Sequence, residues 1–129
     1  MTESRFERDL KPYAEPVTPS ELQVGSIYFF VNFADEEMLT PTMATMIYIG
    51  ENLESGDKNQ VYFQDLDSFN RGVRYGDKDD ANHALFQAGS ENELGHVFDF
   101  DHALDVLLSC SMRRHGFGRT RPSSHLLRR

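Results

Sequence analysis

Apolar and polar positions alternate along several short runs in the middle of this chain, with the period of two that strands have. The strongest run covers residues 26–33, where aliphatic or aromatic side chains occupy both faces. A strand that is apolar on both faces is usually covered on both. The pattern therefore predicts an interior strand at residues 26–33.

Four weaker apolar runs follow, separated by polar segments rich in Gly, Pro and Asp. Residues 45–49 and 60–64 flank a segment with turn chemistry, so they are expected to pair as a hairpin. Residues 69–75 predict a weaker fourth strand. Residues 84–87 and 95–98 predict a final hairpin.

One helix is predicted between Asp99 and Arg114, where apolar residues recur at spacings of three and four. They form one stripe, which is expected to pack into the core: Phe100, Ala103, Leu104, Leu107, Leu108 and Ser111. Acids at the start of the helix and arginines at its end complement the helix dipole. Strands followed by a helix predict an α+β fold, a curved antiparallel sheet of about five strands with a C-terminal helix across one face.

Residues 22–28, a turn that leads through Gly25 into the first strand, look like the first strand of small SH3-like barrels. The resemblance covers seven residues and implies that the sheet would curl into a partial barrel. Barrels of this kind carry many unrelated functions, so the resemblance implies none of them.

Charge divides the chain into an acidic body and a basic end. Residues 1–112 hold seven Lys and Arg against twenty-one Asp and Glu, whereas residues 113–129 hold six arginines and no acid. The two parts carry −14 and +6, which together give the net charge of −8. We expect an extended arm over residues 1–17, a single α+β domain over 18–115 and a basic tail over 116–129.

Composition and motifs argue against several classes of function. Cys110 is the only cysteine, which leaves no internal disulfide and no cysteine-rich zinc site. No stretch reaches the roughly eighteen apolar residues of a membrane span, and no signal-peptide core is present, so a cytoplasmic location without membrane contact is expected. Phosphate-binding glycine loops and hydrolase motifs are missing. We therefore expect neither an enzyme nor a cofactor.

The start of the helix is a candidate metal site, because four possible ligands lie close together in sequence there: His96, Asp99, Asp101 and His102. Two ligands on one helix normally lie three or four residues apart, whereas Asp101 and His102 are adjacent. The acids are also the caps that the helix needs. No metal is expected here, and Cys110 is expected to be a small buried side chain rather than a nucleophile.

Four aromatic residues form the candidate partner-binding site. If the first three strands pair in simple register, Tyr28, Phe30, Tyr48 and Tyr62 share one face of the sheet. They are either core beneath the helix or a surface for a protein partner or a second copy. With this face or the acidic loops as its contact surface, the chain is predicted to be a small non-catalytic binding protein.

The arginine-rich end supports an alternative, a nucleic-acid accessory protein that uses Arg113, Arg114, Arg119 and Arg121. Because an acidic body repels phosphate backbones, only this tail would engage nucleic acid. Two further interpretations of the tail are that it is solvated and that it lies on the acidic body of its own chain. A second alternative is an enzyme whose site joins Asp65, His83 and Cys110 from distant parts of the chain.

Overall fold

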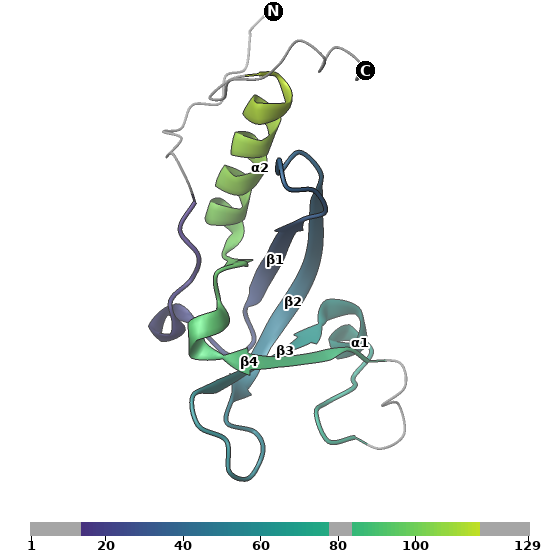
Figure 1. Ribbon diagram of the computed structural model, residues 1–129. Coiled ribbons are helices and arrows are strands. Elements are labelled where there is room, and N and C mark those ends of the chain that lie inside the picture. The colour runs from purple at the N-terminus through teal and green to yellow at the C-terminus, as the bar shows by residue number, and fades with distance from the viewer. Residues whose placement is uncertain (1–13, 78–83, 117–129) are drawn as a thin grey trace, which may run out of the picture.

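The computed structural model describes residues 14–77 and 84–116. Figure 1 shows one antiparallel sheet with a long helix against it. The strands are β1 (Ile27–Phe33), β2 (Pro41–Glu51), β3 (Gln60–Asp65), β4 (Phe86–Ser90) and β5 (Val97–Phe98). The helices are α1 (Leu66–Asn70) and α2 (Phe100–Arg114), with short 3-10 helices at η1 (Pro19–Glu21) and η3 (Glu91–Glu93).

The predicted α+β fold is confirmed. The described strands form a sheet of five in the order β4-β3-β2-β1-β5, and every neighbouring pair is antiparallel. β4 and β5 lie at the two edges of this order, so the described strands do not close into a barrel. In Figure 1, β4 runs across the direction of β1 and β2, which is the strong twist that antiparallel sheets adopt.

β1 lies between β2 and β5, as its two apolar faces predict. Tyr28 and Phe30 point to one side, where both rings meet the ring of Phe63 edge-on. Phe29 and Val31 point to the other side and pack with α2. Because β1 has a paired strand on each side, its interior position is confirmed.

The larger core lies on the face that Tyr28 and Phe30 share. Its buried members come from four strands and from the segments around the 3-10 helices: Val17, Tyr28, Phe30, Met46, Tyr48, Val61, Phe63, Leu94 and Val97. Burial of aromatic and aliphatic side chains is the main source of stability in a domain of this size.

α2 packs on the opposite face of the sheet through small side chains. Ala103 and Val106 lie against Val31 and Phe98, and Ala14 joins them from the N-terminal segment. Small residues let the helix backbone come close to the sheet. The helix is therefore held mainly at β1 and β5.

Part of the expected N-terminal arm belongs to the folded body. Val17 is buried in the larger core, and its N–H donates to the carbonyl of Val97 at 2.9 Å. The rest of the arm, residues 1–13, and the tail from residue 117 onward lie outside the described residues.

The predicted hairpin of the second and third strands is present as β2 and β3. β2 is longer than the expected 45–49, because it begins at Pro41 and continues past Gly50 to Glu51. A β-bulge between Tyr48 and Gly50 shifts the pairing with β3 by one residue. The strand therefore extends beyond both predicted ends, residues 45 and 49.

The predicted strand at residues 69–75 is wrong. The chain forms the short helix α1 and then turns, because Asp65 caps the helix with its side chain. One carboxylate oxygen accepts from the Ser68 N–H at 2.9 Å, and the other accepts from the Ser68 hydroxyl at 2.6 Å and from the Leu85 N–H at 2.7 Å. A local cap has overridden the weak strand pattern.

The predicted final hairpin is also wrong. β4 pairs with β3 and β5 pairs with β1, so the two apolar runs lie at opposite edges of the sheet. The polar segment between them contains η3, which is capped by Ser90 and Glu93. This segment crosses from one edge to the other instead of turning back.

Replacing Asp65 with alanine is expected to lower the free energy of unfolding by about 1–2 kcal/mol, because the cap of α1 and the link to Leu85 are lost together. Burial raises the pKa of Asp65, but the hydrogen bonds from Ser68 and Leu85 outweigh it and hold this pKa below its ordinary value of 3.8. The stabilisation is therefore present above pH 3.8 and is lost as the pH falls further.

Urea denaturation of the wild type and Asp65→Ala at neutral pH and below pH 3.8 measures this effect. Asp67→Ala is the matched control, since Asp67 is exposed and its ion pair with Arg71 at 3.5 Å is a surface contact. A loss with Asp65→Ala no larger than with Asp67→Ala would contradict the cap's role.

Candidate functional site

The four aromatic residues of the predicted partner site are buried, each with 7% or less of its surface exposed. Tyr28, Phe30 and Tyr48 share one face and contact the Phe63 ring within the larger core. Tyr62 points to the other face, because the register pairs Phe63 with Tyr48. Three of them are core residues, but on the face of the sheet opposite α2 and not beneath the helix, and the four residues form no common open surface.

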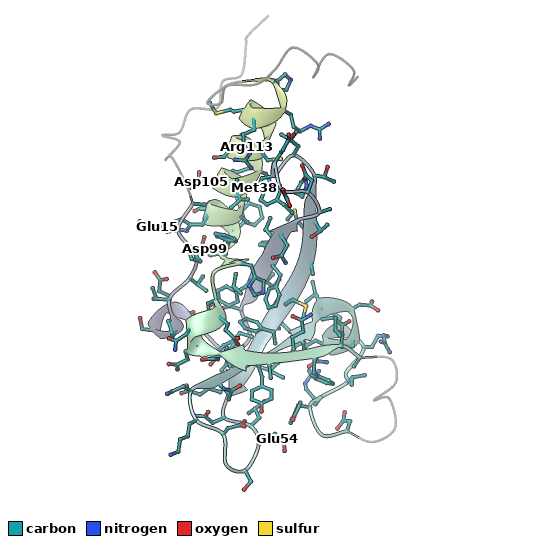
Figure 2. All side chains as sticks on the ribbon, viewed as in Figure 1. Glu15, Met38, Glu54, Asp99, Asp105 and Arg113 are labelled. Atoms are coloured by element: carbon teal, nitrogen blue, oxygen red, sulfur yellow. The ribbon has the colours of Figure 1, made fainter. Side chains whose placement is uncertain are left out.

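The two described arginines of the predicted tail site hold the β1–β2 loop, residues 34–40. Arg113 donates from Nε and Nη2 to the Met38 carbonyl at 3.1 and 2.9 Å, and Arg114 donates to the Leu39 carbonyl at 2.8 Å. Figure 2 shows Arg113 beside Met38 at the C-terminal end of α2, far from Asp99 at its start. Arg119 and Arg121 lie outside the described residues.

Asp35 organises the same loop from within. Its carboxylate accepts hydrogen bonds from the N–H groups of Leu39 and Thr40, the shortest at 2.8 Å. Burial raises the pKa of Asp35, but these bonds and the charge of Arg113 outweigh it and leave the pKa below its ordinary value. The basic end of α2 is therefore fixed against an ordered acidic loop.

The cluster at the start of α2 serves as a helix cap. Asp99 accepts from the His102 N–H at 2.9 Å and contacts His102 Nδ1 at 2.8 Å. Among residues 14–77 and 84–116, no three His, Cys, Asp or Glu side chains lie close enough together to hold a metal ion. Asp99 therefore binds the helix's own backbone.

The residues of the enzyme alternative are not brought together where they are described. Cys110 is buried on α2, with its Sγ 3.6 Å from the Leu39 carbonyl. Asp65 caps α1 and bonds to Leu85. His83 lies outside the described residues. Asp65 and Cys110 therefore serve separate structural contacts.

An apolar groove, not found from the sequence, runs between α2 and the sheet. We call it the helix groove, a cavity of about 120 Å³ lined by Phe29, Met43, Phe100, Ala103, Leu104 and Leu107. The Phe29 and Phe100 rings meet edge-on there, with centroids 5.7 Å apart. The lining is thus made of β1, β2 and one side of α2.

The groove exists because the apolar arc of α2 is wider than its contact with the sheet. Side chains advance by about 100° per residue around a helix. Measured from Ala103, the buried Cys110 lies at about −20°, whereas Leu107, Phe100 and Leu104 lie at about 40°, 60° and 100°. The stripe predicted from the sequence is therefore only partly buried, and its far side lines the groove.

The apolar surface continues beyond the groove. Phe100 is 68% exposed and Met43 is 46% exposed, and Ile27, on the same face of β1 as Phe29, is 44% exposed. Single exposed apolar residues are ordinary, but contiguous ones commonly mark an interaction site. The apolar spacing of α2 predicted the part of this surface that the helix supplies. The part supplied by Met43 and Ile27 depends on how β1 and β2 pair, which the sequence did not show.

Comparisons with protein-family models, with curated proteins and with solved structures find no match for this chain. None of the described helices is both long enough and apolar enough to cross a membrane. A functional conclusion therefore depends on the geometry of the chain itself.

Proposed function

We propose that this chain is a small binding protein that acts through protein–protein contact rather than catalysis. Its contact surface is the helix groove together with the exposed apolar side of α2, in place of the buried aromatic face. The observation that carries the proposal is the exposure of Phe100 and Met43, which line one apolar groove, and of Ile27 on the same face of β1 as Phe29.

The partner that fits this surface is a second copy of the chain. Phe100, Leu104, Leu107 and Ser111 follow one another at spacings of four, three and four, the spacing of residues along the seam between two packed helices. A twofold dimer, the commonest oligomer, needs such a self-complementary patch. We therefore place a second α2 in the groove.

Charge sets the direction of the pair. α2 is acidic at its first turn, with Asp101, and basic at its last turn, with Arg113 and Arg114. An antiparallel pair puts the basic end of each helix beside the acidic end of the other, which supports that direction over the parallel one. The net charge of −8 opposes association, so the dimer is expected to be weak.

Sedimentation velocity from about 1 µM to about 1 mM is expected to show a reversible monomer–dimer equilibrium. Leu107→Glu is expected to raise the dissociation constant at least about tenfold, because it buries a charge in the seam. Met112→Glu is the matched control: it adds the same charge at an exposed position about 180° from Ala103. A wild type that stays monomeric, or equal effects of the two variants, would refute the proposal.

A further inference from the structure

A second cavity lies at the other end of the molecule, on the β2–β3 hairpin. It has a volume of about 420 Å³, within the range of about 300–1,000 Å³ that small-molecule sites have. Its walls come from five parts of the chain, and the residues used here are Ile49, Leu53, Gln64, Phe69, Arg74 and Tyr75. None of these residues lines the helix groove.

Gln64 provides a buried acceptor in the cavity wall. Its side chain is 0% exposed, and its Nε2 donates to the Ser68 hydroxyl and to the Val73 carbonyl, both at 2.9 Å. These two bonds fix the orientation of the amide. Its Oε1 is buried without a hydrogen-bond partner. A buried acceptor of this kind is uncommon and indicates a missing donor.

The remaining walls favour a flat aromatic ring. The Arg74 guanidinium lies 3.7 Å from the centroid of the Phe69 ring and donates to the Phe69 and Val73 carbonyls. This cation is therefore held in place and can stack on a second ring. Ile49 and Leu53 supply apolar contacts.

Tyr75 adds an aromatic wall whose polar atom is already engaged. Its hydroxyl donates to the carboxylate of Glu54, and its ring meets the rings of Tyr62 and Phe86 at 5.3 Å each. Tyr62 in turn donates to Asp57. Figure 2 shows Glu54 on the hairpin loop, at the opposite end of the molecule from Arg113. Gln64 Oε1 is thus the buried acceptor of the cavity wall that has no hydrogen-bond partner.

We propose that this cavity binds a small planar aromatic molecule that carries an N–H or O–H donor, with the donor directed at Gln64 Oε1 and the ring against Arg74 and Phe69. The ligand is neutral, because Glu54, Asp57 and Asp77 near the cavity residues disfavour an anion, whereas the Arg74 guanidinium in the wall disfavours a cation. This site is independent of the proposed dimer.

The test uses indole, and benzofuran as the isosteric probe that lacks the N–H donor. Titration of each into ¹⁵N-labelled full-length protein is expected to shift the Gln64 side-chain amide and the backbone amides of Leu53 and Tyr75. Indole is expected to bind about three- to tenfold more tightly than benzofuran, the contribution of one hydrogen bond to a buried acceptor.

Two variants keep the test decisive. Gln64→Met keeps the size of the side chain and removes the acceptor, so the ratio of indole to benzofuran affinity is expected to fall to about one. Leu53→Trp fills the cavity from a partly exposed position and is expected to abolish binding of both probes even if Gln64→Met fails to fold. Leu85→Trp, exposed and outside the cavity, is the control that keeps wild-type binding.

Three results would overturn the proposal. They are the absence of shifts at the cavity residues with either probe, equal affinity of the wild type for indole and benzofuran, and unchanged binding in Leu53→Trp. Each of them is independent of whether the chain forms a dimer.

Discussion

Replacing Phe63 with alanine is expected to lower the free energy of unfolding by about 3–5 kcal/mol, the usual cost of removing a buried phenylalanine. Phe63 is 3% exposed, and its ring contacts the rings of Tyr28, Phe30 and Tyr48. Truncation would leave a cavity where three rings now meet, on strands that cannot close it without moving the sheet. Urea denaturation followed by circular dichroism measures the change.

Phe100→Ala is the matched control for this prediction. Phe100 is 68% exposed, so the same truncation is expected to cost about 1 kcal/mol or less. The measurement is made at low protein concentration, where the proposed dimer is dissociated and its interface does not contribute. Similar losses in the two variants would mean that the core does not centre on Phe63.

The sequence predicted the elements whose pattern is strong and local. The two-faced run of β1 and the three- and four-residue spacing of α2 each need only the chain's own period. The strand expected at 69–75 failed because the Asp65 cap, a contact between neighbours, favours a helical turn over a weak strand pattern. The final hairpin failed because the partners of β4 and β5 lie far away in sequence.

The side of α2 that meets the sheet was harder to predict than the helix. The predicted stripe included Ala103 but consisted mainly of long apolar residues. In the structure α2 meets the sheet through Ala103 and Val106, and Cys110 is buried beside the β1–β2 loop. Close packing favours small side chains at the contact and leaves the long ones on its flank. Small residues spaced by three and four, 103, 106 and 110, were the signal in the sequence that marks the buried side.

The candidate aromatic face depended on strand register, which the sequence does not determine here. One residue of slip exchanges the two faces of a strand. The polar loop between β2 and β3 is too long to fix the register, so either Tyr62 or Phe63 could face the core. The structure pairs Phe63 with Tyr48, and Tyr62 consequently lies beside Gly50 on the other face. The unpartnered acceptor of Gln64 could not be predicted from the sequence either. Whether its Oε1 finds a hydrogen-bond donor depends on residues that only folding brings near it.

Gly50 is the residue through which this register can be tested. It has φ of 138°, a left-handed backbone that side chains disfavour, and it follows the β-bulge. An added Cβ would also lie 3.3 Å from Cδ2 of Leu53. Gly50→Ala is therefore expected to lower the free energy of unfolding by about 1–3 kcal/mol, mainly through backbone strain.

Gly95→Ala is the matched control, because Gly95 has no positive φ and an added Cβ meets nothing within 4 Å. That variant is expected to change the free energy of unfolding by less than about 1 kcal/mol, and to stabilise if anything. Urea denaturation of the two variants gives the comparison. If Gly50→Ala is as well tolerated as Gly95→Ala, the left-handed turn is not required at the bulge. The pairing of Tyr62 with Gly50, and with it the placement of Gln64 in the cavity wall, would then have to be redrawn.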